Sequence, residues 1–253
     1  MKIVAVIPAR GGSKSIPLKN LKVFAGKPLI AWSILSAKRS KNVDRVIIST
    51  DHPEIARIAK KYGAEVVVRP PELAIDTIGI EPTLKHVYET LLKQEKYKAD
   101  ALVLLMPTSP TRQTFHIDDA IQIFKKKKVD SVLGVNQTPA NHTPYWTLTR
   151  SPQGKVSLWG GVPLKKILTR RQDFPQKCYA RNDLVYVLKP KNLFDKERSN
   201  IYGNKIELYE VADPAIYEMD INTPDEWAEA EIKFQKLILK KWKPARPGKP
   251  KKA

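Results

Sequence analysis

Short runs of apolar, mostly β-branched residues alternate with longer amphipathic segments along the first half of the chain. The runs predict buried strands, and they are residues 2–8, 44–50, 64–70, 100–107 and 129–135. The segments between them predict helices, and these are residues 28–40, 52–63, 80–96 and 116–128. Regular alternation of strand and helix is typical of an α/β fold. We therefore expect a mostly parallel sheet with helices on both faces.

The pattern changes between residues 137 and 176, which are rich in proline, glycine, tryptophan and basic residues. We interpret this stretch as an excursion from the main sheet, either a small β subdomain or a partner surface. Residues 183–189 and 205–211 then predict returning strands, and a final amphipathic helix is expected from Thr223 onward, with Thr223 and Glu226 forming a capping box. One domain would thus occupy residues 1–239.

Polar clusters follow the first four predicted strands. In order they read ARGGSK, STD, RPPELAID and PTSPTR. In open α/β sheets, ligands bind outside the carboxyl ends of the strands. The clusters therefore predict a ligand site along that edge.

Charge and cysteine content narrow the class of protein. The formal net charge is +19, of which seven positive charges fall in residues 240–253, a proline-containing tail that we expect to be disordered. The remaining +12 fits either an anionic substrate or a lysine-rich proteome. A single cysteine, Cys178, excludes an internal disulfide and a multi-cysteine zinc site. Without a long apolar run or a signal peptide, a cytoplasmic protein and no membrane contact are expected.

The first polar cluster, within VIPARGGSKSIPLKN at residues 6–20, has the composition of a phosphate-binding loop. Gly11 and Gly12 allow close approach of the backbone to an anion. Three cations within ten residues suit a triphosphate, and Asn20 can read a pyrimidine edge. Neither the Walker pattern nor GxGxxG is present, so an ordinary glycine turn with solvated charges is the alternative.

The whole string resembles the N-terminal signature of the acylneuraminate cytidylyltransferase family, the CMP-sialic acid synthetases and their pseudaminic and legionaminic acid relatives. The resemblance continues in order through FAGKPLIAWSI, VIISTD, RPPELAIDT, PTSPTR, PYW, RRQDFPQ, RND and MDINTPDEW. It implies a Rossmann-like (GT-A-like) nucleotidyltransferase fold with a dimerisation excursion. It also implies transfer of CMP from CTP to the anomeric hydroxyl of a nine-carbon or related α-keto acid sugar, with Mg²⁺ or Mn²⁺, in a homodimer.

The resemblance also assigns residues. Nucleotide binding is assigned to Arg10, Gly11, Gly12, Ser13, Lys14, Lys19, Asn20, Arg69 and Asp76. Sugar binding is assigned to Met106, Thr108, Ser109, Arg171 and Tyr186. The metal would be held by Asp220 and Asn222, and the catalytic residues would be Arg10, Lys19 and Asp220.

Several of these residues also fit a different role. Asp76 could cap the next helix with Thr77, Arg171 could pack or form a dimer contact, and Asp220 could act as a base. His142 fits a surface position better than a catalytic base. Five positions depart from the sialic acid pattern, namely Ile80, Met106, Ala180, Asp183 and Asn222. The first four argue against a strict N-acetylneuraminate enzyme, and none selects another nonulosonic acid.

Two alternative functions are compatible with parts of the sequence. A nucleotidyltransferase acting on a sugar 1-phosphate has the same architecture, but its usual GxGTR loop is absent. A non-enzymatic nucleic-acid-binding protein would carry aromatic residues among its lysines. Here the aromatic residues are mostly at core-like positions, so nucleic acid contact is expected only weakly, through the tail.

Overall fold

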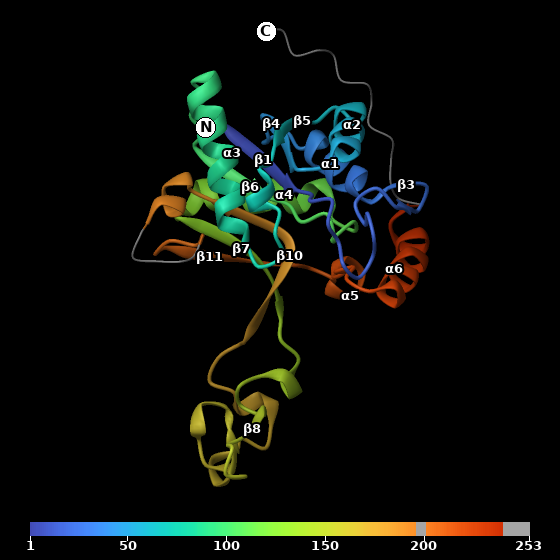
Figure 1. Ribbon diagram of the computed structural model, residues 1–253. Helices are drawn as coiled ribbons and strands as arrows, with labels where there is room; N and C mark the ends of the chain where they lie inside the picture. Colours follow the sequence, from blue (N-terminus) through green and yellow to red (C-terminus); the bar gives the residue numbers. More distant parts are fainter. Residues whose placement is uncertain (196–200, 240–253) are drawn as a thin grey trace. The chain divides into compact units, whose positions relative to one another are not determined.

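The computed structural model describes residues 1–195 and 201–239 (Figure 1). Within these residues the main sheet has seven strands in the order β11-β7-β10-β6-β1-β4-β5. Their bounds are Ile3–Pro8 for β1, Arg45–Thr50 for β4, Glu65–Val68 for β5, Ala101–Leu104 for β6, Ser131–Gln137 for β7, Tyr179–Leu188 for β10 and Ile206–Glu210 for β11. Strands β4 and β6 lie parallel to β1, β5 lies parallel to β4, and β10 runs antiparallel to β6. The predicted mostly parallel sheet is confirmed.

Helices cover both faces of this sheet. They are α1 (Leu29–Arg39), α2 (Pro53–Lys61), α3 (Ile80–Glu95) and α4 (Thr114–Lys127). Residues Ile3, Ala5 and Ile7 of β1 share one core with buried residues of α1, α2 and α4. Successive strand residues point to opposite faces, so Val4 and Val6 face the other side, where α3 packs against β1. This arrangement confirms the three-layer α/β/α fold.

A second core joins the start and the end of the chain. It forms around the short hairpin β2 (Val23–Phe24) and β3 (Lys27–Pro28), helix α1 and the helix α6 (Pro224–Leu237), with the short α5 (Pro214–Tyr217) before it. The Phe24 ring meets the Trp227 and Phe234 rings edge-on at 5.4 and 5.3 Å. The predicted capping box is present, because the Thr223 hydroxyl accepts from Glu226 N while the Glu226 carboxylate accepts from Thr223 N. This core holds α6, and the segment before it, beside the first loop.

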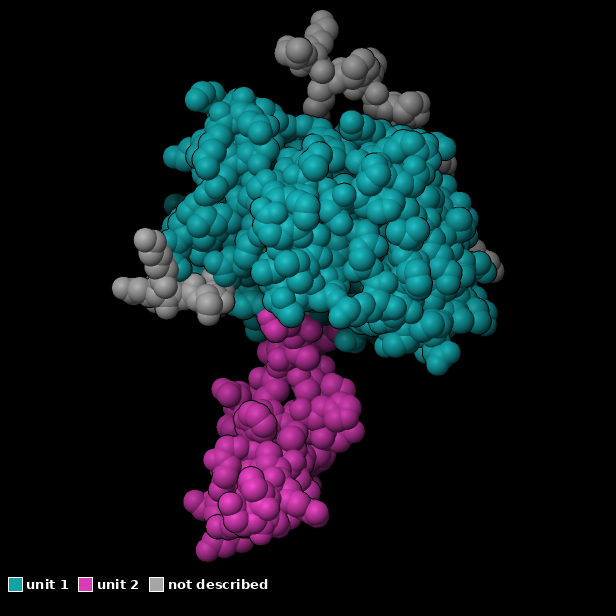
Figure 2. All heavy atoms as spheres, in the orientation of Figure 1, with its two compact units in different colours: residues 1–134, 182–253 teal, residues 135–181 magenta. Residues whose placement is uncertain are grey.

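The chain divides into two compact units, coloured separately in Figure 2. The second unit is Val135–Arg181, and the predicted excursion at residues 137–176 falls inside it. It contains the hairpin β8 (Leu148–Arg150) and β9 (Val156–Leu158) and several short 3-10 turns. The predicted tail, residues 240–253, lies outside the described residues. In the part of the chain that the structure describes, no helix is both long and apolar enough to cross a membrane.

Candidate active site

Four loops of the first unit converge where the parallel strands end. They follow β1, β4, β5 and β6 and contain the four polar clusters singled out in the sequence. Because β4 and β6 pair in parallel with β1, and β5 with β4, all four loops leave the same edge of the sheet. The four polar clusters therefore lie at one edge of the sheet because the strands before them are parallel.

The first loop is held close to the end of β4. The N–H of Gly11 donates to Asp51 Oδ1 at 3.0 Å, and Asn20 Nδ2 donates to the carbonyl oxygen of Arg10 at 3.1 Å. A Cβ added at Gly11 would lie 2.8 Å from His52 Cδ2, so only glycine fits there without a shift. Asn20 is buried and braces the two ends of the loop. Its role at the cytosine stays a prediction.

Two cations of the first loop meet the carboxylate of Asp76. Arg10 forms an ion pair with Asp76 Oδ1, and Lys14 Nζ lies 2.7 Å from Asp76 Oδ2. The hydrogen bond from Lys14 and the nearby Arg10 charge lower the pKa of Asp76. Helix α3 has Gly79 as its N-cap residue, with no side-chain cap, so the alternative that Asp76 caps this helix is wrong. The carboxylate sits against the cations that were predicted to hold phosphates.

Lys19 connects the first loop to the segment before α6. Its Nζ donates to the carbonyl oxygen of Ile221 at 2.7 Å. Burial lowers the pKa of Lys19, while the charges of Asp220 and Glu226 act in the opposite direction. The N–H of Ile221 donates to the carbonyl oxygen of Thr108 at 3.1 Å. Ile221 therefore joins three regions that the sequence keeps far apart.

Asp220 and Asn222 flank the buried Ile221 and are themselves exposed. Asn222 Nδ2 donates to Asp220 Oδ2 at 2.7 Å. The Glu226 carboxylate accepts from Asn222 N at 2.7 Å, and the hydrogen bonds from the Asn222 and Thr223 N–H groups lower the pKa of Glu226. One carboxylate and one amide thus lie together beside the first loop, while Glu226 is committed to the capping box.

A cavity of about 240 Å³ lies between the first loop and the loop after β5. Its polar lining includes Arg10, Arg69 and Asp76, and its apolar lining includes Ile80 and Met106. Arg69 is almost fully buried, its Nη2 donates to Ser49 O at 2.8 Å, and burial lowers its pKa. The cavity combines an apolar wall with fixed cations, which suits a nucleotide base and its phosphates.

The loop after β6 supplies Met106 to this cavity and hydrogen-bond partners to its surroundings. Ser109 is buried, and the structure gives no hydrogen-bond partner within residues 1–195 and 201–239 to Ser109 Oγ or to Thr108 Oγ1. Arg112, at the end of the same loop, is fully buried, and burial lowers the pKa of its guanidinium to about 9. No role was predicted for Arg112 from the sequence, because an arginine that closes a polar loop resembles a surface residue.

Tyr186 lies on β10, opposite Leu104 of β6. Its hydroxyl donates to Asp183 Oδ1 at 3.2 Å, and the ring is buried. This places Asp183, one of the departures from the sialic acid pattern, in direct contact with the predicted sugar-site tyrosine. The structure thus joins two residues whose contact the sequence does not reveal.

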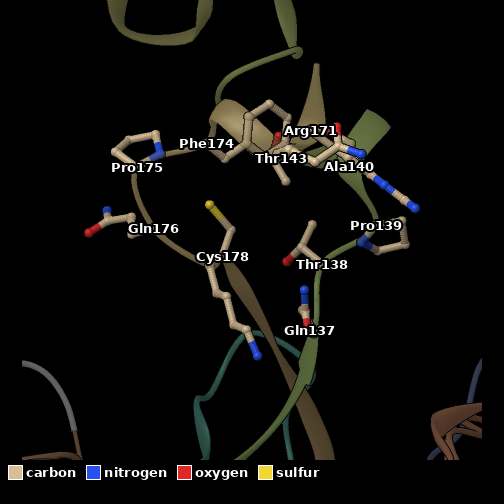
Figure 3. A pocket seen from close by; sticks show the side chains of 12 residues that line it. Gln137, Thr138, Pro139, Ala140, Thr143, Arg171, Phe174, Pro175, Gln176 and Cys178 are labelled. Carbon is tan, nitrogen blue, oxygen red and sulfur yellow. Dashed lines mark hydrogen bonds between the residues drawn. The ribbon is translucent and has the colours of Figure 1, made fainter. Parts of the chain in front are cut away.

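Arg171 belongs to the second unit and lines a pocket there of about 700 Å³ (Figure 3). Phe174 and Cys178 line the same pocket, with Cys178 directed into it. His142 is exposed at the end of a short 3-10 turn, in agreement with a surface position. Arg171 belongs to the second unit, whereas the other predicted site residues belong to the first, and its role at a sugar stays a prediction.

The fold and this site together define an α/β protein of the nucleotidyltransferase class. Residues 4–235 match the cytidylyltransferase family, and the chain belongs to that family. The protein is therefore an enzyme, and the alternative of a non-enzymatic nucleic-acid-binding protein is wrong.

Relatives and solved structures agree with this membership. Post-translational flagellin modification protein B of Campylobacter coli is 32% identical over 94% of this chain and 95% of its own length. CMP-N,N'-diacetyllegionaminic acid synthase of Legionella pneumophila subsp. pneumophila is 34% identical over 91% and 95%. N-acylneuraminate cytidylyltransferase of Oncorhynchus mykiss is 32% identical over 90% of this chain and 49% of its own length. The structure of CMP:2-keto-3-deoxy-manno-octonic acid synthetase complexed with CTP shares the fold, with a TM-score of 0.68, 18% identity and coverage of 93% and 99%.

Proposed function

We propose that the protein transfers CMP from CTP to the anomeric hydroxyl of an acidic α-keto acid sugar and releases pyrophosphate. One observation carries the proposal: the cationic first loop contacts the Asp220 segment through Lys19 and Ile221, 2.7 Å apart. Phosphate-binding charge and a carboxylate thus lie at one site. Relatives named for legionaminic acid and N-acylneuraminate support the choice of an acidic sugar.

In this reaction the protein forms no covalent bond to the substrates, and it acts by positioning them and by stabilising charge. The sugar oxygen forms a bond to the α-phosphorus, the bond from that phosphorus to the bridging oxygen breaks, and pyrophosphate leaves with the electron pair. Arg10, Lys14 and Lys19 stabilise the negative charge that develops on the phosphates. The triphosphate takes the place of Asp76 against Arg10 and Lys14. The proton of the attacking hydroxyl passes to solvent water, and Asp220 stays ionised as the ligand of the metal.

Mg²⁺ fits the residues beside the first loop. This ion keeps several waters and is bound in nucleotide sites by one or two carboxylates together with substrate phosphates. Asp220 would supply the carboxylate, and Asn222 Oδ1 would add a neutral oxygen, while Asn222 Nδ2 donates to Asp220 Oδ2 at 2.7 Å. When bound, the ion neutralises phosphate charge. Within the described residues no three His, Cys, Asp or Glu side chains are grouped so that they could hold a metal ion. The substrate phosphates would supply further oxygen ligands.

The second unit supplies the surface for a homodimer. Its exposed large apolar residues are Leu148, Val156, Trp159, Val162, Leu164 and Ile167. Exposed apolar residues gathered on one small unit favour association. In the dimer, Arg171 pairs with the sugar carboxylate as a bidentate donor. Sedimentation of the purified chain tests this part, and an active monomer would contradict it.

A coupled assay tests the function. The protein is incubated with CTP, Mg²⁺ and a panel of nonulosonic acids, and both pyrophosphate release and the mass of the CMP-sugar are measured. We expect product with at least one acidic keto sugar and none with a sugar 1-phosphate. Product with only a sugar 1-phosphate would contradict the proposal and would indicate a nucleotidyltransferase that acts on sugar 1-phosphates. UTP in place of CTP serves as the control for the base.

A further inference from the structure

Arg112 is a fully buried cation. Its side chain is completely inaccessible to solvent. Within residues 1–195 and 201–239 it forms no salt bridge, and the charge of Asp183 only partly offsets the effect of burial, which lowers the pKa of Arg112. Burial of a charge is costly unless hydrogen bonds compensate for it. The hydrogen-bond acceptors of Arg112 therefore indicate which parts of the structure its guanidinium group fixes.

All four acceptors of Arg112 are neutral oxygens from three different elements. Its Nε donates to the carbonyl oxygen of Leu184, and Nη1 donates to Ser33 Oγ at 2.8 Å. Nη2 donates to the carbonyl oxygens of Met106 at 2.6 Å and Asp183 at 3.1 Å. The planar guanidinium thereby fastens the loop at residues 106–112 to helix α1 and to strand β10. An ammonium group, with three donors on one atom, cannot reproduce this arrangement.

The same loop supports the segment that carries Asp220. Thr111 Oγ1 donates to the carbonyl oxygen of Tyr217 at 2.6 Å, and the carbonyl oxygen of Thr108 accepts from Ile221 N at 3.1 Å. These two contacts flank Asp220 on its N-terminal and C-terminal sides. The loop also presents Met106 to the cavity beside Arg10 and Arg69. Displacement of the loop would therefore move both Asp220 and Met106, the residue predicted to bind the sugar.

We infer that Arg112 is a positioning residue for the transfer reaction, which fixes the loop at residues 106–112 and through it the carboxylate of Asp220. The inference rests on the proposed function. Arg112 does not touch the first loop in any described contact. The residue therefore acts on the geometry of the chemical step and not on the binding of the triphosphate.

The test compares Arg112→Lys with Arg57→Lys, an exposed arginine of α2 that pairs with Glu54. For Arg112→Lys we expect kcat to fall by about 30-fold to 100-fold, the order found for an ångström-scale misplacement. The dissociation constant for CTP, measured by calorimetry without sugar, stays within about threefold, a change of the size of one exposed contact. Arg57→Lys changes neither quantity. Unchanged kcat in a folded Arg112→Lys enzyme, or an equal loss of CTP affinity, overturns the inference.

Two further measurements keep the inference testable if Arg112→Lys does not fold or if the wild-type protein shows no activity. Ser33→Ala removes one acceptor and leaves the charge, so we expect a loss in kcat of about threefold to tenfold with CTP affinity unchanged; a wild-type kcat overturns the inference. Hydrogen exchange needs no turnover. In the folded variants it should accelerate at residues 106–111 and 217–222 but not at residues 9–20. If no acidic sugar reacts with the wild-type protein, the proposed function fails, while the exchange pattern still decides the role of Arg112.

Discussion

Lys19 Nζ lies 2.7 Å from the carbonyl oxygen of Ile221, across 202 positions of the chain. The contact places a cation of the first loop next to Asp220. Since Lys19 is partly buried and its pKa is lowered chiefly by desolvation, its charge is maintained there against a cost. In the proposed reaction Lys19 therefore acts on the phosphates and also holds the segment that carries Asp220.

Replacement of Lys19 by methionine is expected to lower kcat/KM by about 100-fold or more, because it removes a transition-state cation and the link to Ile221. Steady-state kinetics with CTP and the acidic sugar measures the change. Lys38→Met, at an exposed position of α1, is the control and should retain full activity. A Lys19→Met enzyme as active as this control would remove Lys19 from the mechanism.

The two glycines of the first loop should respond differently to alanine. A Cβ at Gly11 meets His52 at 2.8 Å, whereas a Cβ at Gly12 meets nothing within 4 Å. We expect Gly11→Ala to destabilise the fold by about 1–3 kcal/mol, the usual effect of overpacking, and Gly12→Ala to stay within about 0.5 kcal/mol. Urea unfolding without ligand measures both variants. Equal destabilisation by the two substitutions would contradict the position of His52.

Asn222→Asp should strengthen metal binding. It replaces an amide that donates to Asp220 by a second carboxylate, which is a better ligand for a divalent cation. We expect the Mn²⁺ affinity of the CTP complex, measured by electron paramagnetic resonance, to rise by about tenfold, a factor that corresponds to about 1.4 kcal/mol.

Asn222→Ala is the matched control for this prediction. It removes the orienting hydrogen bond without adding charge and should weaken Mn²⁺ binding. Weaker binding in Asn222→Asp as well would mean that repulsion from Asp220 outweighs the new ligand.

His116 should make the protein sensitive to acid. The ring is buried, its Nδ1 accepts from Gln113 N at 3.0 Å, and burial lowers its pKa from 6.5 to about 3. Below pH 6.5 the unfolded chain binds a proton that the folded protein does not, so stability falls as the pH decreases from 6.5 toward 3. Between about pH 7 and about pH 4.5 this linkage amounts to roughly 2 to 3 kcal/mol.

His116→Gln separates this effect from other acid-sensitive groups. Glutamine can accept the same N–H of Gln113 and does not titrate. Urea unfolding at both pH values should show a smaller difference for the variant than for the wild type. The same pH dependence in both proteins would place the acid sensitivity elsewhere.

Much of the architecture could be predicted because it depends on local periodicity. Buried apolar runs and amphipathic segments specified the alternation of strands and helices, and parallel pairing places the ends of β1, β4, β5 and β6 at one edge. The capping box of α6 was readable for the same reason, since Thr223 and Glu226 are three residues apart. Ordered motifs along the chain supplied the family, which the match over residues 4–235 confirms.

The contacts that organise the site are of another kind. Arg112 holds backbone carbonyls 71 and 72 positions away, and Lys19 holds one 202 positions away. Almost every residue carries such a carbonyl, so composition and spacing cannot indicate which of them becomes an acceptor. The sequence by itself determined which side chains lie at the edge of the sheet and to which family the chain belongs. Only the tertiary structure decided the partners of these side chains, because folding brings one of many chemically equivalent backbone carbonyl groups within hydrogen-bond distance of each.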